Sequence, residues 1–481
     1  MQHRGLAPML HKSTIIYSAD VLYFRIMHPP KVKQNIKLPI HNIGSNGEGV
    51  GQYQGFTVFV DGALPGEVVE ARLYQRQKRY GRANLLSVSD PSPHRVQPVC
   101  PLFGRCGGCQ LMHLAYPEQL VIKRQRVVDA LQRIGKLDAI EVGPCLPSPS
   151  PLAYRNKIQM PVRESPTGGL QIGLYARSSH DLVEVETCHI HCPLGEQVYK
   201  EAAPIIKQSG IKAYDPATGS GELRHILIKS AVNTGEALVI LVTNGEATPL
   251  LKKIAGQIMS RCPAVKGVVH NIHTERDNVI LGSVNKILEG SGIIQETLCG
   301  MQFKVSPASF FQVNPQQAEH LYEKALEFAQ LKGHETVLDA YCGVGTMSLF
   351  FARQAKKVIG VECVPEAIED AKENARLNQI QNAEFICGNA ETIIDSLADI
   401  DTIILNPPRK GCEPSFLEGI GRLRPATVVY ISCDSATLSR DLAVLHQMGY
   451  HVDFIQPYDM FPQTAHVECV AKVSGKLKVE S

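Results

Sequence analysis

The sequence predicts a multidomain α/β protein, and three observations lead to that prediction. The chain has 481 residues, which is too long for one hydrophobic core. Short apolar runs separated by Gly and Pro turns fill residues 34–93, a pattern typical of a small β-barrel. From residue 301 onward, continuous apolar runs alternate with helical patterns, as in a parallel sheet that is covered by helices.

Four segments follow from these patterns. Residues 1–33 fit poorly with the rest of the chain, so we expect an extension that is disordered or that precedes a native start at Met27. Residues 34–93 are predicted to form an OB-like barrel and residues 94–300 a central α+β domain. Residues 301–481 are predicted to form a Rossmann-like domain.

Composition limits the classes of partner. A net charge of +2 gives no global attraction to nucleic acid, so such a partner would need a local basic patch. One patch contains Arg72, Arg76, Lys78, Arg79 and Arg82.

The apolar segment 15–27 is interrupted by Asp20 and Arg25, which argues against a membrane span. Fourteen cysteines without a secretory signal indicate a reducing compartment, so we expect a cytoplasmic protein without a membrane partner or an obligate protein partner.

A cluster of cysteines precedes a predicted helix. Their spacing in a reducing compartment suggests a metal site rather than disulfides, and the candidate ligands are Cys100, Cys106, Cys109 and Cys188. Four thiolates suit either zinc or an iron–sulfur cluster, and Cys192 is a rival for the fourth position. Residues 116–134 have the spacing of an amphipathic helix, whose basic face we interpret as solvated.

A nucleotide site is predicted where the strands of the C-terminal domain end. Asp339 ends one predicted strand and precedes the turn Gly343-Val-Gly345, while Glu362 ends the next strand. Ligands of open α/β sheets bind beyond the carboxyl ends of the strands, where an acid such as Glu362 can accept both ribose hydroxyls of an adenosine. A dinucleotide site needs a third glycine, whereas this chain has Thr346 there, so the pattern favours S-adenosylmethionine over NAD.

Cys433 and Glu468 form the predicted catalytic pair. Cys433 follows the apolar run 428–431, so its thiol is expected at the same sheet edge as Asn406, which precedes a rigid Pro-Pro turn. Glu468 lies in the apolar run 466–470, and burial there would raise the affinity of its carboxylate for a proton. A cysteine packed in the core is the alternative for Cys433, but its place beside the pocket favours a nucleophile.

A thiol and a base beside a methyl donor predict methylation of a pyrimidine carbon. C5 of uracil is too weak a nucleophile to attack a methylsulfonium unaided, whereas addition of a thiolate to C6 makes an enolate that can. After methyl transfer, Glu468 would remove the C5 proton and Cys433 would be eliminated from the ring.

Residues 36–475 resemble the RNA uracil-5-methyltransferase family, of the type that has a TRAM barrel and a 4Fe-4S cluster and acts on 23S ribosomal RNA. The motifs are Phe310-Phe-Gln312-Val-Asn314, the loop 339–345, and Ser432-Cys433. The resemblance implies a seven-stranded class I methyltransferase sheet, an RNA substrate and S-adenosylmethionine as donor. It implies that the donor is bound by Gln312, Tyr341, Glu362 and Asn406, and the 4Fe-4S cluster by Cys100, Cys106, Cys109 and Cys188.

Two positions depart from the family pattern. Asn406 replaces an Asp that is usual before Pro-Pro-Arg, and Asp434-Ser435 replaces the Asn-Pro that commonly follows the nucleophile. An amide keeps hydrogen bonding but loses the charge, so we expect weaker tuning at Asn406 rather than lost function.

RNA contacts are expected from two basic segments, and the cysteine cluster is expected to be structural. The segments are the barrel loop 76–82, where Tyr80 can stack on a base, and Tyr154-Arg155-Asn156-Lys157.

Two other functions compete with RNA uracil methylation. One is methylation of an exocyclic amine, for which an aromatic residue is usual where Arg409 stands. The other is an iron–sulfur protein that binds RNA without catalysis.

Overall fold

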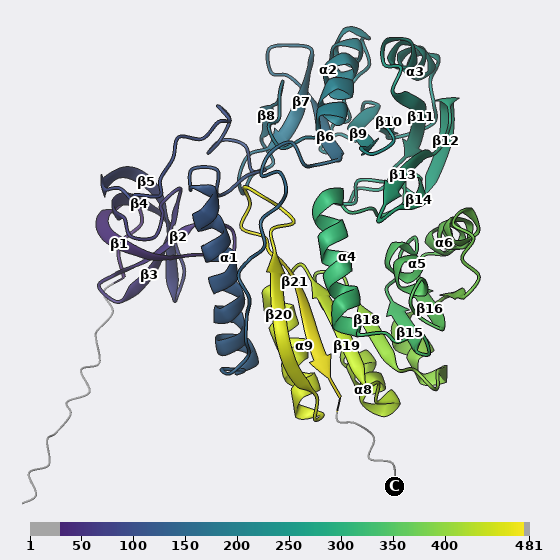
Figure 1. Cartoon of the computed structure of the whole chain (residues 1–481). Helices are drawn as coiled ribbons and strands as arrows, with labels where there is room; N and C mark the ends of the chain where they lie inside the picture. Colours follow the sequence, from purple (N-terminus) through teal and green to yellow (C-terminus); the bar gives the residue numbers. More distant parts are fainter. Residues whose placement is uncertain (1–28, 476–481) are drawn as a thin grey trace, which may run out of the picture.

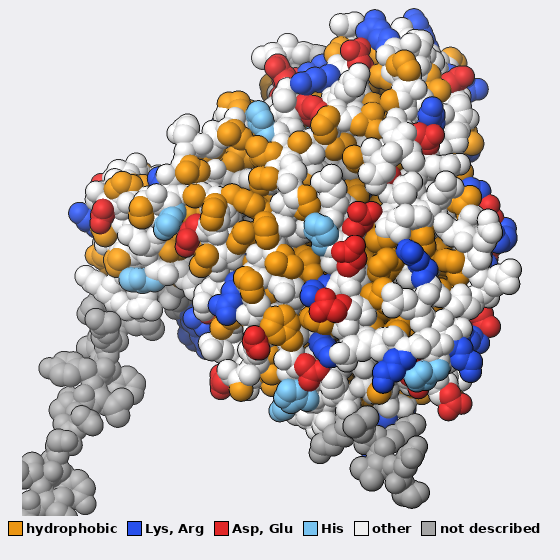
Figure 2. Space-filling view, viewed as in Figure 1, with side chains coloured by type: hydrophobic (Ala, Val, Ile, Leu, Met, Phe, Trp, Pro, Cys, Tyr) orange, Lys and Arg blue, Asp and Glu red, His pale blue; other side chains and the backbone are white. Residues whose placement is uncertain are grey.

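The computed structural model describes residues 29–475, so the predictions for Met27 and for most of the extension 1–33 lie outside the described residues. A small barrel, a central sheet and a C-terminal sheet follow one another along the chain (Figure 1). Within residues 29–475, no helix is long and apolar enough to cross a membrane. Figure 2 shows cationic and acidic side chains interspersed over the face in view, which agrees with a net charge of only +2.

The N-terminal strands close into a barrel in the order β1-β2-β3-β5-β4, as predicted. Alternation along each strand selects the side chains that fill the barrel, and β3 buries Phe56, Val58 and Val60 in turn. Closure leaves no long open strand edge. The strands are β1 Asn35–Ile43, β2 Gly49–Tyr53, β3 Phe56–Asp61, β4 Val68–Arg76 and β5 Tyr80–Asp90.

The central sheet has the order β12-β11-β10-β9-β6-β7-β8, and its inner strands β9 and β10 are buried on both faces. Alternate residues of β10 enter two different cores: Val239 packs with helices α2 and α3, and Ile240 packs with the β13–β14 hairpin. The strands are β6 Lys157–Glu164, β7 Leu170–Tyr175, β8 Leu182–Glu184, β9 Leu223–Ala231, β10 Glu236–Thr243, β11 Val265–Ile272, β12 Val284–Gly290, β13 Ile294–Leu298 and β14 Met301–Val305. The helices are α2 Pro193–Gln208 and α3 Pro249–Arg261.

Helix α1 (Tyr116–Ala130), followed by a short π-helical turn at Leu131–Gly135, packs on the C-terminal sheet. Val127 of this helix shares a core with Leu442 and Ile455 of the C-terminal domain. The prediction of a solvated basic face is wrong for Lys123, whose relative exposure is 1%, because that face meets a buried loop of the C-terminal domain.

The C-terminal sheet has seven strands in the order β17-β16-β15-β18-β19-β21-β20, as the resemblance implies. Helices α4, α5 and α6 cover one face, and α7, α8 and α9 cover the other. The strands are β15 Thr336–Ala340, β16 Lys357–Glu362, β17 Ala383–Cys387, β18 Thr402–Leu405, β19 Thr427–Ser432, β20 His451–Tyr458 and β21 Glu468–Ser474. The helices are α4 Pro315–Ala329, α5 Thr346–Ala352, α6 Pro365–Leu377, α7 Ala390–Ile393 (with a 3-10 turn at Ile394–Ser396), α8 Pro414–Leu423 and α9 Ser435–Gln447.

One edge of this sheet gathers the predicted site. Strands β15, β16, β18 and β19 are parallel and end there, while β21 runs antiparallel to β19 and begins there. Register then fixes the neighbours: Ser432 pairs with Cys469, and Tyr458 pairs with Glu468. The first residue beyond β19 and the first residue of β21 therefore lie at the same edge.

Candidate active site

The loop after β15 turns sharply, and a Cβ atom on Gly343 would meet no atom beyond its chain neighbours within 4 Å. Tyr341, Gly343 and Gly345 all have positive φ, at 68°, 54° and 82°. A Cβ atom on Gly345 would stand 3.1 Å from the Cβ of Ala371, so the backbone there approaches α6 as closely as glycine allows. Gly345 also precedes the first residue of α5, where unpaired amides favour a negatively polarised ligand.

The two acids at the ends of β15 and β16 differ in their surroundings. Asp339 is buried and accepts a 2.5 Å hydrogen bond from Ser348 Oγ, and burial raises the pKa of its carboxyl to about 7. Glu362 is half-buried and accepts hydrogen bonds from the backbone amides of Gly343, at 3.2 Å, and Val364, at 3.1 Å. The buried carboxylate of Asp339 thus bonds within the loop, whereas the half-buried carboxylate of Glu362 remains accessible beside the turn.

Tyr341 and Asn406 border the same edge. The Tyr341 hydroxyl donates to Glu391 at 3.0 Å, and its ring lies 5.7 Å from the ring of Phe416. Asn406 directly follows β18 and is half-buried. Both side chains are held by strand ends rather than by free loops, which fixes their position relative to Glu362.

The segment that contains Gln312 is fastened to the central domain. The Asn156 side chain donates to the Gln312 carbonyl at 3.1 Å, and the Asn156 amide donates to the Val313 carbonyl at 3.0 Å. Asn314 caps helix α4 and donates to the Met460 carbonyl at 3.2 Å. Phe310, at the start of the segment, has a relative exposure of 64%. Gln312 itself is buried, so the segment presents one exposed ring and one inward amide.

Cys433 is held between a strand end and a helix start. It follows β19 and is half-buried, and the next residue, Asp434, caps helix α9. Asp434 Oδ1 accepts hydrogen bonds from the amides of Ala436, at 2.9 Å, and Thr437, at 3.0 Å. Because Asp and Asn are equally good caps, the departure at position 434 preserves the local structure.

Glu468 is buried at the start of β21, and its charge interacts with that of Cys433. Burial raises the pKa of the Glu468 carboxyl to about 8, against the opposing charge of Arg409. Burial, and then the charge of Glu468, raise the pKa of the Cys433 thiol to about 11, while Arg409 lowers it. The structure therefore brings together the two residues of the predicted pair and adds Arg409, which the sequence did not single out as a partner.

The four predicted cysteine ligands line one cavity of about 390 Å³. Burial raises the pKa of the Cys106 thiol, and raises that of Cys188 to about 11. Cys192 instead caps helix α2 from a buried position, its Sγ accepting from the Gly195 amide at 3.4 Å, which removes it as a rival.

The structure does not show the metal site that the sequence suggested. Within residues 29–475, no group of three or more His, Cys, Asp or Glu side chains is placed to hold a metal ion. What the four cysteines share is the cavity that they line.

The cysteine cavity extends toward the predicted catalytic pair. Besides the cysteines, its lining includes Arg155, Arg409, Phe461 and His466. Burial lowers the pKa of His466 to about 4, and Arg409, whose charge also acts on Glu468, contributes to that lowering. His466 was not predicted, although its position two residues before Glu468 puts both side chains on one face of an extended chain.

The two predicted RNA-binding segments are only partly exposed. Arg76, Lys78 and Arg79 are exposed on the β4–β5 turn, but Arg82 pairs with the buried Glu48 at 2.8 Å. Tyr154 and Asn156 are buried, so their predicted contact with RNA is wrong; they bond the carbonyls of Pro462 and Gln312 instead.

A groove that the sequence did not indicate lies between the barrel, helix α1 and the start of α9. Its volume is about 660 Å³. The lining includes His41, Phe59, Arg126, Arg133 and Ser435, which come from three separate parts of the chain. Only folding assembles these residues, so no local sequence signal could have identified them.

Comparison with known proteins gives a consistent result. A family model described as tRNA (uracil-5-)-methyltransferase matches residues 282–474, and a TRAM domain model matches residues 31–86. An uncharacterized RNA methyltransferase of Clostridium acetobutylicum is 43% identical over 92% of this chain and 98% of its own length. Another from Halalkalibacterium halodurans is 44% identical over 92% of this chain and 97% of its own length.

A solved structure is similar along most of the chain. It is that of the Pyrococcus abyssi tRNA (uracil-54, C5)-methyltransferase in complex with S-adenosyl-L-homocysteine. The TM-score is 0.74 and the identity 27%, covering 91% of this chain and all of the other.

Proposed function

Because the chain belongs to the family of S-adenosylmethionine-dependent RNA uracil-5-methyltransferases, we propose that it methylates C5 of a specific uridine through a covalent bond to Cys433. The observation that supports this mechanism is the shared sheet edge: Cys433 directly follows β19, and Glu468 is the first residue of the neighbouring strand β21. A thiol and a buried carboxylate at that edge are the two groups that C5 methylation needs.

The proposed reaction has three steps. The Cys433 thiolate adds to C6 of uracil, and the electron pair of the C5=C6 bond moves to make an enolate. C5 then attacks the methyl group of S-adenosylmethionine, whose carbon–sulfur bond breaks to release S-adenosylhomocysteine. Glu468 finally takes the proton from C5, and the S–C6 bond breaks so that the double bond reforms and the thiolate leaves.

Electrostatics explain why both groups rest protonated. Without substrate, burial holds the Cys433 pKa at about 11 and the Glu468 pKa at about 8. A sulfonium cation bound nearby favours the thiolate and the carboxylate, and so lowers both pKa values. The donor is thus expected to activate the pair, with Arg409 acting in the same direction.

The donor itself is assigned to the turn after β15. Glu362 would accept the ribose hydroxyls, because it is accessible where Asp339 is not. Gln312, Tyr341 and Asn406 would complete the donor site around the methionine part and the uracil. Asn406 would both donate to and accept from the ring, whereas a carboxylate only accepts.

A 4Fe-4S cluster is proposed for the cysteine cavity, held by Cys100, Cys106, Cys109 and Cys188. Such a cluster would bind thiolates and thereby remove the cost of burying them. The methyl transfer needs no electron, so we assign the cluster a structural role.

RNA is proposed to enter along the groove between the barrel and α1, which ends at Ser435 beside Cys433. The four-cysteine pattern resembles that of enzymes acting on 23S ribosomal RNA, so we propose 23S ribosomal RNA as the target. The Pyrococcus abyssi structure is of a tRNA enzyme, which makes tRNA the second candidate. A cytoplasmic location follows from either substrate.

Two measurements test this assignment. Mapping 5-methyluridine in cells that lack the gene should show its loss from one class of RNA, and loss from tRNA alone would contradict the 23S target. RNA containing 5-fluorouridine should form a denaturation-resistant complex with the protein, since fluorine cannot leave C5 as a proton does. Methylation without such a complex would favour an exocyclic-amine enzyme, and neither result would favour a non-catalytic RNA-binding protein.

A further inference from the structure

The loop that leads into Glu468 is buried along most of its length. It spans residues 459–467, between β20 and β21, and its buried members include Asp459, Met460, Gln463 and Val467. A buried loop must satisfy its own backbone polar groups through neighbouring elements. The partners of this loop therefore determine where β21 begins, and with it where the carboxylate of Glu468 lies.

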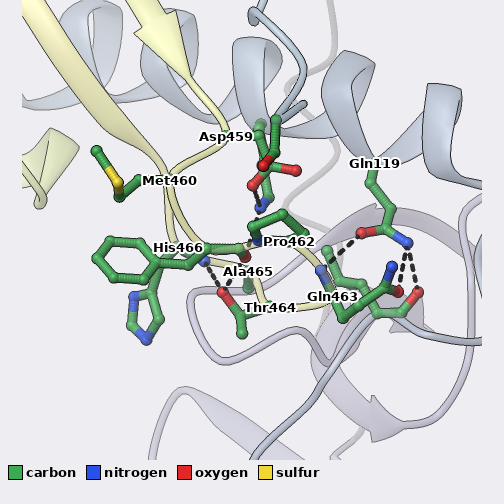
Figure 3. Close-up of polar contacts among 12 residues, drawn as sticks. Gln119, Asp459, Met460, Pro462, Gln463, Thr464, Ala465 and His466 are labelled. Atoms are coloured by element: carbon green, nitrogen blue, oxygen red, sulfur yellow. Dashed lines mark hydrogen bonds and ion pairs between the residues drawn. The ribbon is translucent and has the colours of Figure 1, made fainter. Parts of the chain in front are cut away.

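Three side chains on one face of helix α1 supply many of these partners. Gln119, Lys123 and Arg126 lie on successive turns, at the spacing of one helical face. Gln119 exchanges hydrogen bonds with Gln463, accepting from its amide at 3.2 Å and donating to its side-chain oxygen at 3.1 Å. Arg126 donates to the Ala465 carbonyl at 2.7 Å. Figure 3 shows the contact of Gln119 with Gln463 beside the rest of this loop.

The contact of Lys123 is the most deeply buried of the three. Its Nζ lies 2.5 Å from Asp459 Oδ1 and 3.1 Å from the Phe461 carbonyl. The relative exposures of the two charged side chains are 1% and 0%. Asp459 directly follows Tyr458, the cross-strand partner of Glu468. The ion pair between Lys123 and Asp459 therefore lies next to Tyr458, the residue opposite the proposed base Glu468.

A buried ion pair of this kind is poorly explained by stability alone. Removing two charges from water costs several kcal/mol, and apolar residues of similar size are often equally stabilising (about 1 to 4 kcal/mol better in some cases). A buried pair can instead specify a single geometry, since its charges must find their partners inside the protein. Here both partners of Lys123, Asp459 and the Phe461 carbonyl, belong to the loop 459–467.

From these contacts we propose that Lys123 is a positioning residue for Glu468. Together with Gln119 and Arg126 it holds the loop 459–467, so that the carboxylate of Glu468 meets the C5 proton once the methyl group has been transferred. This proposal rests on the proposed function, in which Glu468 is the base. Lys123 touches neither substrate in this scheme and acts through Asp459.

The variant that tests the proposal replaces both charges, because removing only one would leave a buried charge unpaired and could prevent folding. The double substitution Lys123→Met with Asp459→Leu keeps the side-chain volumes similar and removes the ion pair that joins helix α1 to the loop 459–467. Arg124→Met is the matched control: it removes a positive charge from the neighbouring, exposed position of the same helix. Melting temperatures of the three proteins establish that all are folded.

The assay uses 23S ribosomal RNA and tRNA transcribed with uridine carrying deuterium at C5. In the double variant we expect kcat to fall by up to about 100-fold, since a displaced base loses proximity, while KM for RNA stays within about twofold. The deuterium isotope effect on turnover should rise and the covalent intermediate should accumulate, because proton removal has become limiting.

Several outcomes are decisive. If the double variant is folded and has the kcat and isotope effect of the wild type, Lys123 does not position Glu468. If kcat falls with an unchanged isotope effect and no accumulated intermediate, the Lys123–Asp459 ion pair affects a step other than proton removal, and the inference is equally wrong. If the wild type forms no denaturation-resistant complex with 5-fluorouridine RNA, the proposed function fails, which is a separate result.

Discussion

The catalytic edge and the cysteine cavity are organised in different ways. At the catalytic edge, strand register, the Asp434 cap and the tethered loop 459–467 fix Cys433 and Glu468 through bonds within the protein. In the cysteine cavity, four thiols from loops line a space of about 390 Å³. The first region is preorganised by its own chain, whereas the second is proposed to depend on a bound cluster. Changes at the edge should therefore alter rates, and changes at the cavity should alter stability.

Cys433→Ala should produce the largest effect. Without the thiol the enolate cannot form, so turnover should drop by about 10⁴-fold or more, as when a nucleophile is removed from other covalent enzymes. RNA affinity and melting temperature should stay near those of the wild type, because Cys433 is only half-buried. Retained turnover in this variant would exclude the covalent mechanism.

Glu468→Gln should separate the two halves of the reaction. Methyl transfer should proceed once, after which the covalent species should accumulate, and turnover should drop by about 10²- to 10⁴-fold.

The pH dependence of stability provides a second readout for Glu468→Gln. The folded pKa of about 8 lies above the ordinary value of 4.5, so the wild type loses stability as pH rises from 4.5 to 8.

The amide avoids that loss, so the melting temperature of Glu468→Gln should exceed that of the wild type by the largest margin above pH 8. An equal margin at pH 5 and pH 9 would show that Glu468 is ionised throughout, contrary to its burial. Rapid release of product from the variant would show that another group removes the proton.

Cys109→Ser should act mainly on stability. The proposed cluster would give the wild type about four iron atoms per chain in an anaerobic preparation. The variant should lose this iron and melt several degrees lower. The rate of methyl transfer by the fraction that remains folded should fall by less than about tenfold. Cys192→Ser is the control, because serine caps a helix well and Cys192 lies outside the cavity. Equal iron loss in both variants would contradict the assignment of ligands.

The pH dependence of kcat/KM should report the free enzyme. Since Glu468 acts as a carboxylate and its pKa is raised to about 8, its titration alone should raise the rate by about tenfold between pH 7 and 9. Deprotonation of Cys433, whose pKa is raised to about 11, should make the rise steeper still. A rate that is flat or falls over this range would mean that neither group limits the reaction.

Asn406→Asp should have the smallest effect. A carboxylate at the end of β18 would add a charge but could no longer donate a hydrogen bond, so we expect KM for the donor or for RNA to change by less than about fivefold. Steady-state kinetics with each substrate varied in turn would measure it. A change of 100-fold or more in kcat would show that the amide takes part in the chemical step.

The sequence predicted the elements with strong local patterns and missed those that depend on folding. The apolar runs at β15, β16, β18 and β19 were recognisable because buried parallel strands are apolar on both faces. Strand β17, half-exposed at the edge of the sheet, carries a weaker signal and was not predicted.

The same distinction applies to the site. The position of Cys433 and Glu468 at the sheet edge could be predicted because each follows or begins an apolar run. Their catalytic roles stay predictions. The buried roles of Lys123 and Asn156 could not, because each depends on a partner more than a hundred residues away. Their local patterns, a basic helix face and a basic loop, are those of ordinary surface.

The central claim is that sulfur at position 433 bonds to the pyrimidine ring, and peptide mapping of a trapped complex tests it most directly. The protein would be incubated with 5-fluorouridine RNA and S-adenosylmethionine, digested with protease and nuclease, and sequenced by mass spectrometry. We predict a methylated fluorouridine nucleotide attached to Cys433. A nucleotide attached to Cys412 or Cys469, or methylated RNA with every cysteine unmodified, would contradict the account.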